Sequence, residues 1–389
     1  MPGFEVFGKE EQEAIQELFD KNGGILLAHS FDAVRNRVYR VREFEKAFAN
    51  RLGSPHAQAV SSGTAALKVG LKALGVGPGD EVITQSFTFV ATVEAILDTG
   101  ATPVIVDIDD TLNICPKSLE SAITKKTKVI LPVHMMGTAA NMDAVMALAK
   151  KYQFKVLEDT AQACGGTYNG KFLGTIGSIG AFSTDAGKTL STGEGGMVLA
   201  SDENLFTRAR AFHDHGHEYN ATVGRGEEAA LGWGFNYRMT ELQGAIGLVQ
   251  LSKLDYILEK QRENKRKLKE AIDTSRFRFR NILNPEGDIA DTLVIFLESA
   301  GQARKLVAGM KKQGLGTKNL PDAISWHFAA YWSHIFSEDG SSSVESLKSR
   351  WKQSTEWLER AVALPVMVNM EDSAIDKVAE TMNRLSKEL

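Results

Sequence analysis

The sequence is poor in cysteine, in excess charge of either sign and in long apolar runs. Its 389 residues include only two cysteines, Cys115 and Cys164, which excludes a disulfide scaffold and an all-cysteine metal site and favours a reducing compartment. The 45 basic and 49 acidic residues leave a net charge of −4, so nothing indicates a nucleic-acid-binding protein. No run reaches the roughly 18 apolar residues of a membrane span, and the acidic N-terminal stretch lacks the apolar core of a signal peptide. We therefore expect a soluble cytoplasmic protein that binds neither membranes nor nucleic acids.

Glycine, in contrast, is abundant and unevenly distributed. The chain has 35 glycines, and 17 of them lie in the 83 residues from Gly165 to Gly247, where an even spread would give about seven. Glycine permits positive φ angles and close approach of the backbone to a neighbour or a ligand. This stretch is therefore the first place to look for a functional site.

The first half of the chain alternates short apolar strands with helices. Helical spacing predicts helices near 44–52 and over 63–74, 88–98 and 142–152, and apolar runs predict strands from Glu81 and over 102–106, 128–133 and 154–158. This alternation is typical of an α/β fold with a mainly parallel sheet covered on both faces. Ligands bind such sheets outside the carboxyl ends of the strands. The functional candidates are therefore residues 85–89, 134–137, 159–162 and 183–188.

The second half predicts a smaller α/β unit. A long helical pattern from Thr240 runs into a charged stretch that ends at Glu270, and we expect it to leave the first domain. A strand from Thr292 and helices near 303–312 and 374–389 follow. The sequence thus indicates two domains, residues 1–255 and 256–389, with an exposed loop at Gly340–Ser343.

Two short motifs are candidates for ligand binding, and each has a structural alternative. S-S-G-T-A-A-L, from Ser61 to Leu67, begins a helix whose free N–H groups suit a phosphate, or it simply caps that helix. Glu158 and Asp159 end a strand, where at most one of two consecutive side chains can point into a given pocket. That carboxylate can pair with a protonated pyridinium nitrogen, or it can cap the next segment.

A third motif connects these candidates. Residues 181–198, A-F-S-T-D-A-G-K-T-L-S-T-G-E-G-G-M-V, place Lys188 in a loop rich in glycine and hydroxyl residues between two apparent strands. Most lysines are solvated surface groups. A lysine in an apolar pocket, however, loses its proton more readily and can act as a nucleophile that forms a Schiff base.

Together with F-T-F-V-A-T, V-H-M-M-G and G-F-N-Y-R-M-T-E-L-Q, these motifs occur in an order and spacing that resemble a known family. The sequence is similar to the pyridoxal-phosphate sugar aminotransferases of the DegT/DnrJ/EryC1/StrS family from about Val41 to Leu254, and more weakly to the end. The resemblance implies fold-type I: a large domain with a mainly parallel seven-stranded sheet and a smaller C-terminal α/β domain.

The resemblance also implies how the cofactor is held. Lys188 would bind pyridoxal 5′-phosphate covalently and then move protons, and Asp159 would pair with the pyridinium nitrogen. The other expected contacts are ring stacking, the ring hydroxyl and the phosphate, made respectively by Phe89, by Gln162, and by Gly63, Thr64 and Ser183. Asn236 is expected to reach the phosphate of the neighbouring subunit, so the implied assembly is a homodimer with shared sites.

The implied reaction moves the amino group of L-glutamate to a keto- or aldehydo-sugar and gives an amino sugar. H-D-H-G-H-E (213–218) and W-H-F-A-A-Y-W-S-H (326–334) are most similar to the branch that aminates the 8-oxo form of Kdo, a lipopolysaccharide sugar, to 8-amino-3,8-dideoxy-manno-octulosonate. The alternatives are a nucleotide-linked 3-keto or 4-keto-6-deoxy sugar, a sugar dehydratase reaction, and a sensor without turnover. Some relatives that are dehydratases carry histidine at the lysine position, so Lys188 favours transamination.

Four further residues are candidates for substrate contacts. His134 follows a strand at the ligand-binding edge, where a hydrogen-bonded structural histidine is an equal alternative. His213, His215 and His217 alternate as metal ligands on one strand face would, but the sequence after them is typical of a flexible loop. We therefore expect no metal, and favour substrate or dimer contacts for His215, His217 and Arg238.

Overall fold

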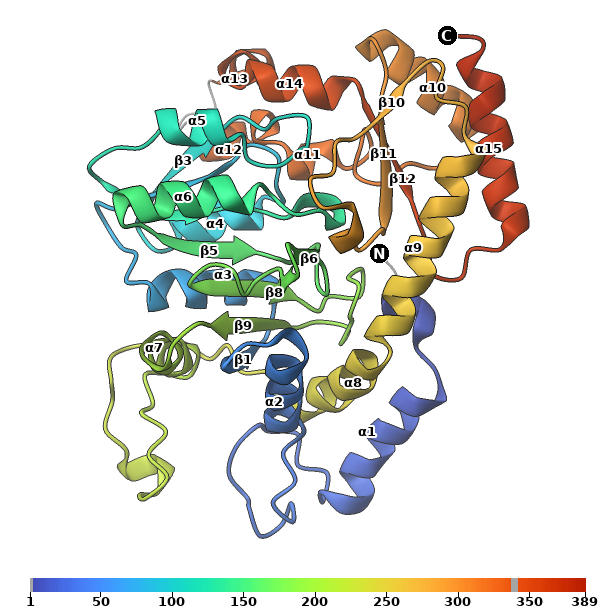
Figure 1. Cartoon of the computed structure of the whole chain (residues 1–389). Coiled ribbons are helices and arrows are strands. Elements are labelled where there is room, and N and C mark those ends of the chain that lie inside the picture. Colours follow the sequence, from blue (N-terminus) through green and yellow to red (C-terminus); the bar gives the residue numbers. More distant parts are fainter. Residues whose placement is uncertain (1–2, 337–341) are drawn as a thin grey trace.

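The protein is built around a seven-stranded sheet with helices on both faces (Figure 1). The computed structural model describes residues 3–336 and 342–389, so Gly340 and Ser341 of the expected loop lie outside the described residues. The strand order is β1-β9-β8-β5-β4-β2-β3. The bounds are β1 His56–Val60, β2 Glu81–Gln85, β3 Thr102–Val106, β4 Thr127–Leu131, β5 Lys155–Asp159, β8 Ile179–Ser183 and β9 Gly196–Ala200. Only β9 runs antiparallel to its neighbours within this sheet, which confirms the mainly parallel arrangement.

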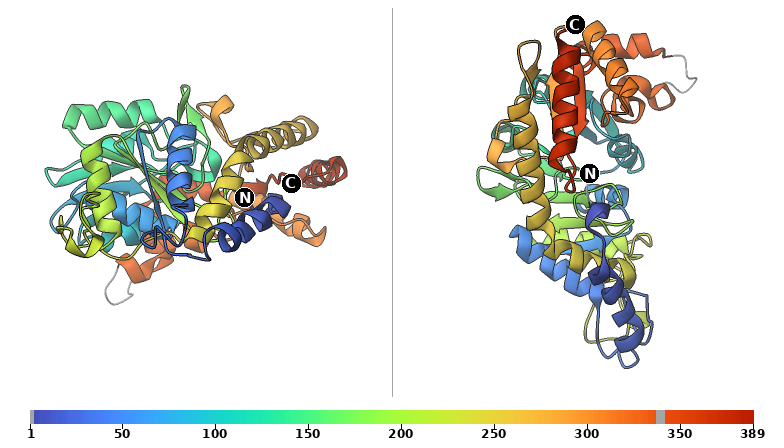
Figure 2. Two further views of the ribbon diagram at one scale, coloured as in Figure 1. Left: turned by 90° about the horizontal axis from the view of Figure 1, so that it is seen from below. Right: turned by 90° about the vertical axis from the view of Figure 1, so that its right-hand side faces the viewer.

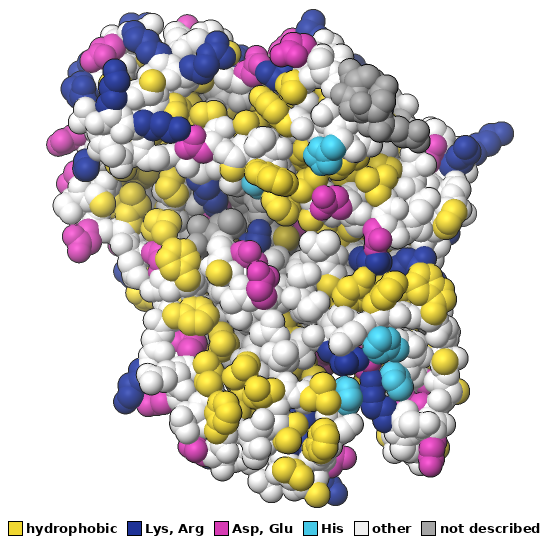
Figure 3. All heavy atoms as spheres, turned by 180° about the vertical axis from the view of Figure 1, so that it is seen from behind, with side chains coloured by type: hydrophobic (Ala, Val, Ile, Leu, Met, Phe, Trp, Pro, Cys, Tyr) yellow, Lys and Arg dark blue, Asp and Glu magenta, His cyan; other side chains and the backbone are white. Residues whose placement is uncertain are grey.

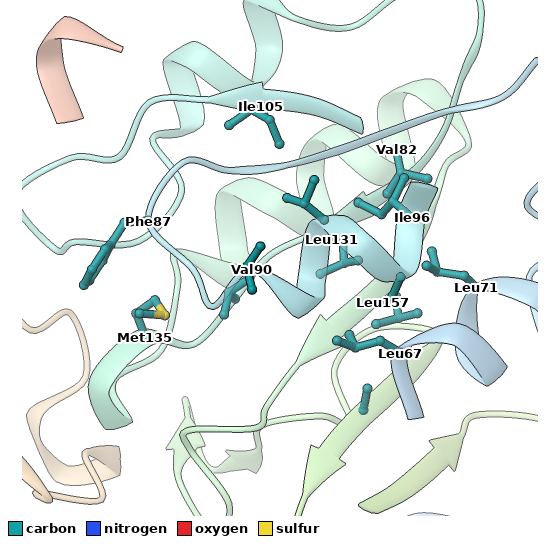
Figure 4. Packing of buried hydrophobic residues seen from close by; sticks show 14 of the residues in the cluster. Leu67, Leu71, Val82, Phe87, Val90, Ile96, Ile105, Leu131, Met135 and Leu157 are labelled. Atoms are coloured by element: carbon teal, nitrogen blue, oxygen red, sulfur yellow. The ribbon is translucent and has the colours of Figure 1, made fainter. Parts of the chain in front are cut away.

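Apolar stripes hold the helices against the sheet. One face is covered by α3 (Gly63–Ala73), α4 (Ala91–Leu97) and α7 (Glu203–His213). The other face is covered by α2 (Arg40–Leu52), α5 (Pro116–Ser121), α6 (Met142–Tyr152) and α8 (Glu241–Ser252). Figure 4 shows the first of these cores, where side chains of α3 and α4 meet those of the strands, among them Leu67, Leu71, Ile96, Val82, Leu131 and Leu157.

The C-terminal part forms a second, three-stranded antiparallel sheet in the order β10-β11-β12. Its strands are β10 Arg278–Phe279, β11 Thr292–Phe296 and β12 Ala361–Pro365, and its helices are α9 Leu254–Ala271, α10 Ala300–Lys312 and α15 Asp372–Ser386. The remaining elements are short or peripheral: α1 Lys9–Lys21, α11 Ile324–His327, α12 Ser333–Phe336, α13 Val344–Arg350, α14 Lys352–Glu359, the hairpin β6 Thr167–Tyr168 and β7 Lys171–Phe172, and the 3-10 turns Gly3–Val6, Met135–Gly137, Arg225–Glu227, Pro285–Gly287 and Ala329–Tyr331. Figure 2 shows α15 and α9 side by side at one end of the molecule.

Two expected helices differ from the observed ones. The helix expected over 88–98 begins only at Ala91, because the N–H groups of Thr88 and Val90 donate to the carbonyls of His327 and Trp326. The long pattern after Thr240 is two helices, α8 and α9, which meet at Lys253.

The division into domains at 255/256 stays a prediction. The C-terminal Trp332 and Trp351 pack into the same apolar cluster as Ile105 of β3, so contacts cross that boundary. Among the described residues, no helix has both the length and the apolar character needed to cross a membrane.

Candidate active site

A cavity of about 310 Å³ lies where the parallel strands β5 and β8 end. Its walls include all seven residues of this chain that were expected to hold the cofactor within one subunit: Gly63, Thr64, Phe89, Asp159, Gln162, Ser183 and Lys188. They come from four separate stretches of sequence, which the sheet topology brings to one edge. A larger hollow of about 510 Å³ lies along α9 and contains none of the expected site residues.

One end of the cavity is the open N-terminus of α3. Ser62 caps this helix, and its side chain accepts the N–H of Ala65 at 3.0 Å. The N–H groups of Gly63 and Thr64 therefore remain at a positive helix end, which is the setting that binds phosphate. A Cβ on Gly63 would lie 2.7 Å from the Cβ of Ser183, so glycine is needed for the strand end and the helix end to approach this closely.

A carboxylate, that of Asp159 at the end of β5, lines the cavity as well as the positive end of α3. Its side chain is almost fully buried; Oδ2 accepts from the Thr92 hydroxyl at 2.8 Å and Oδ1 from the N–H of Ala161 at 3.1 Å. Burial raises the pKa of the Asp159 carboxyl, and the two hydrogen bonds oppose that shift. A cationic nitrogen placed against Asp159 would compensate the burial of its charge.

Glu158 points away from the cavity, as expected for consecutive strand residues. It is fully buried, and its two carboxylate oxygens accept three backbone N–H groups, those of Gly174, Ile176 and Gly177, at 2.6–2.9 Å. Glu158 thus fixes a neighbouring loop, and Asp159 is the carboxylate at the cavity.

Lys188 enters the cavity from a tight loop after β8. The N–H of Lys188 donates to the carbonyl of Asp185 at 2.9 Å, and the N–H of Gly187 donates to the Asp185 carboxylate at 2.7 Å. Burial lowers the pKa of the Lys188 amine, while the charges of Asp185, Asp159 and Asp291 oppose this. A lysine with a lowered pKa is available as a nucleophile and as a carrier of protons.

The middle of the cavity has an aromatic and an amide wall. Phe89 is 44% exposed although it is large and apolar, so a ring face is open to a ligand. The Gln162 amide oxygen accepts the N–H of Met136 at 3.1 Å, which leaves its amide nitrogen as the available donor. A phosphate cradle, a carboxylate, an amine and an aromatic face in one cavity of this size fit pyridoxal phosphate.

The cavity walls also include Glu194, Asn319 and His327, which the sequence had not singled out as site residues. His327 lies in the W-H-F-A-A-Y-W-S-H motif, its ring is 5.3 Å from that of Phe89, and its Nδ1 lies 2.8 Å from the carbonyl oxygen of Ala323. No sequence motif around Asn319 indicates a role in the site. The residue belongs to the C-terminal half of the chain, and the fold brings it to the cavity.

His134 is held within the protein. It is fully buried, its Nδ1 accepts the N–H of Ala140 at 3.1 Å, and its Nε2 lies 3.1 Å from the Glu158 carboxylate. Both ring nitrogens have partners, so the geometry favours the structural alternative over a substrate contact.

The other expected residues lie outside this chain's own cavity. Asn236 is exposed, and Arg238 pairs with the buried carboxylate of Asp214. His215 is exposed after the end of α7, and His217 pairs with Glu228 at 3.0 Å. Because α7 ends at His213 and a turn follows, the alternating histidines do not share one strand face. A role for Asn236 in binding the cofactor therefore requires a second subunit and stays a prediction.

The sequence matches the DegT/DnrJ/EryC1/StrS aminotransferase family over residues 31–383. It is similar to the spore coat polysaccharide biosynthesis protein SpsC of Bacillus subtilis, with 36% identity over 393 residues that cover 98% of this chain and 96% of that protein. It is also similar to GDP-perosamine synthase of Caulobacter vibrioides, with 43% identity over 218 residues, 55% of this chain and 56% of that one. An aminotransferase of known structure from Psychrobacter cryohalolentis has a TM-score of 0.86 at 28% identity, over 98% of both chains.

Proposed function

Because this chain belongs to the DegT/DnrJ/EryC1/StrS family and is a pyridoxal-phosphate-dependent sugar aminotransferase, we propose that it transfers the amino group of L-glutamate to a sugar carbonyl for a cell-surface polysaccharide. The observation that carries this proposal is the presence of Lys188 and Asp159 in one cavity with the open N-terminus of α3. The similarity to a spore coat polysaccharide protein supports the destination of the product.

Each residue has a separate task in this proposal. When bound, pyridoxal phosphate supplies an electron-withdrawing ring that stabilises negative charge beside the transferred nitrogen. Asp159 offers the negative charge that keeps a ring nitrogen protonated, and the N-terminus of α3 with Ser183 holds the phosphate. Lys188 accepts a proton from one carbon and returns it to another, because its lowered pKa lets it lose and regain a proton.

For the acceptor, we propose the 8-oxo form of Kdo. The support is the histidine-rich stretch 213–218 and the motif 326–334, whose His327 is in the cavity wall. A nucleotide-linked 4-keto-6-deoxy sugar is the second candidate, favoured by the 43% identity to GDP-perosamine synthase. A dehydratase reaction is less favoured, because the lysine is retained at position 188.

The acceptor is tested by single-turnover conversion of the pyridoxamine form of the enzyme with a panel of keto- and aldehydo-sugars. We expect 8-oxo-Kdo to react fastest and to yield an amino sugar in equal amount to the enzyme. Faster reaction with a nucleotide-linked keto sugar would replace the first acceptor by the second. Release of ammonia without consumption of glutamate would instead indicate the dehydratase.

We also propose that the enzyme is a cytoplasmic homodimer with shared sites. Several large apolar side chains are more than half exposed: Phe4, Phe19, Phe31, Val34, Leu231, Trp233 and Trp326. Figure 3 shows apolar side chains gathered in patches on one face of the molecule. Exposed apolar patches are typical of protein–protein contact sites, and two of these residues, Leu231 and Trp233, lie in the same segment as Asn236.

A further inference from the structure

The N-terminal turn Gly3–Val6 packs directly on the backbone of the catalytic lysine. The N–H of Gly3 donates to the carbonyl oxygen of Lys188 at 2.8 Å. Gly3 is buried, and a Cβ at this position would lie 2.5 Å from that oxygen and 2.7 Å from the Cβ of Ser191. The N–H of Lys188 is bound to Asp185 within its own loop, so the backbone of Lys188 is fixed from two sides.

The same turn is bound to the C-terminal part of the chain. Glu5 Oε2 accepts the backbone N–H of Asn369 at 2.9 Å, and the Asn369 amide donates to the Glu5 carbonyl at 3.0 Å. Asn369 lies between β12 and α15. Two hydrogen bonds, both donated by Asn369 and accepted by Glu5, therefore connect the turn that holds Lys188 to the segment between the three-stranded sheet and its helix.

A third attachment lies at the junction of α8 and α9. The Lys253 amine donates to the carbonyl of Val6 at 2.8 Å and to the Glu11 carboxylate at 2.8 Å. Glu11 also accepts from the Gln250 amide at 2.8 Å. Figures 1 and 2 show the turn Gly3–Val6 in blue beside the start of α9, with α1 leading away from it.

We propose that Gly3 and Glu5 are positioning residues for the transamination, which fix the catalytic Lys188 relative to the C-terminal part of the chain. The inference rests on the proposed function. Neither residue lines the cavity, so both act through others: Gly3 through the carbonyl of Lys188, and Glu5 through Asn369.

The expected consequence is a loss of rate without a loss of binding. A displacement of reacting groups by about 1 Å can cost on the order of 100-fold in rate. Loosening the turn removes no group that touches glutamate or the cofactor. We therefore expect the maximal rate of the glutamate half-reaction to fall on the order of tenfold, while KM for L-glutamate and cofactor content are unchanged.

The test uses the full-length enzyme loaded with pyridoxal phosphate and follows its absorbance during single turnover with L-glutamate. The variants are Glu5→Ala, Asn369→Ala, the double variant and Gly3→Ala. Glu13→Ala serves as the matched control, because Glu13 lies on α1 and makes only an exposed ion pair with Lys9 in the described structure. If Gly3→Ala does not fold, the Glu5 and Asn369 variants still decide the question.

The inference is supported if Glu5→Ala and Asn369→Ala each lower the maximal rate at unchanged KM, and if the double variant, which removes both hydrogen bonds, loses at least as much rate as either single variant. It is overturned if the variants, the double variant included, only lower the melting temperature and keep the wild-type rate at 25 °C. A wild-type enzyme that does not react with L-glutamate would refute the proposed function itself, which is a different result.

Discussion

At the scale of single residues, the two central groups of the site are shifted in opposite directions by the same cause. Burial raises the pKa of the Asp159 carboxyl and lowers the pKa of the Lys188 amine. Each group is thereby moved toward its neutral form. A buried pair of this kind is prepared for a ligand that brings a positive charge to Asp159 and an electrophile to Lys188.

Among the described residues that line this cavity, Lys188 is the only amine that can bind the cofactor covalently, and Lys188→Ala removes it. We expect the absorbance of lysine-bound pyridoxal phosphate to disappear and transamination to be lost, while the protein stays folded because the Lys188 side chain lines a cavity. The measurement is a visible spectrum of the purified variant beside an activity assay. Lys150→Ala, at an exposed lysine of α6, is the control. An unchanged spectrum in Lys188→Ala would remove the central assignment.

Asp159→Asn keeps the size of the side chain and removes its charge. We expect a rate loss on the order of 10²–10⁴-fold, since a neutral amide does not hold a ring nitrogen protonated. Thr92→Val is the matched comparison, because it removes the 2.8 Å hydrogen bond to Asp159 and leaves the carboxylate in place; its loss should be much smaller. Stopped-flow rates of the glutamate half-reaction distinguish the two variants. Equal rates for Asp159→Asn and the wild type would show that another residue serves the ring nitrogen.

At the scale of elements, the sequence predicts those parts whose burial is periodic. The strands β2 to β5 and the helices α3 and α6 have apolar patterns that determine their place, and their predicted bounds agree with the structure within two residues. The start of α4 could not be predicted, because it is set by hydrogen bonds from Thr88 and Val90 to residues more than 230 positions away. Local patterns contain no information about such distant partners.

Helix α2 and strand β1 are joined by a titratable contact. Glu45 of α2 accepts the N–H of Ala59 at 2.8 Å. Burial raises the pKa of the Glu45 carboxyl to about 7, although this hydrogen bond and the charges of Arg210 and Arg42 oppose the shift. Its ordinary value is 4.5. Between these values the folded protein binds a proton that the unfolded chain has lost, so the folded state loses stability as pH rises from about 4.5 to about 7, because the buried carboxyl must then ionise.

Glu45→Gln should remove that pH dependence. The amide stays neutral and its oxygen still accepts from Ala59, so we expect the variant to be more stable than the wild type at pH 8, by up to about 3 kcal/mol, and equal to it near pH 4.5. Urea unfolding at both pH values measures the difference. Glu43→Gln, at an exposed position of the same helix, should not change the slope. A wild-type slope retained in Glu45→Gln would assign the titration to a different group.

At the scale of the whole molecule, the cavity is completed by residues that no local motif identified. Asn319 comes from the C-terminal part of the chain, and only the folded topology shows that it lines the same cavity as Lys188. The places of Lys188, Asp159 and the start of α3 in the cavity wall, in contrast, could be predicted from the sequence. Lys188 and Asp159 lie at or after the end of a recognisable strand, and the third group begins a recognisable helix. The exposed Asn236 lies outside this cavity, so its proposed role in the site requires a second subunit.

The proposed shared site can be tested by mixing two defective subunits. If Asn236 serves the cofactor of the neighbouring subunit, a hybrid dimer of Asn236→Ala and Lys188→Ala subunits has one complete site, with Lys188 from the first and Asn236 from the second. Random mixing makes about half of the dimers hybrids, so activity at limiting cofactor should return to about a quarter of the wild-type value. If Asn236 acts within its own subunit, every site in the mixture contains one of the two substitutions. If Asn236 has no role in the site, the activity of each site depends only on whether its subunit contains Lys188. Mixing then gives no more activity than the average of the two parents, and the shared site must be abandoned.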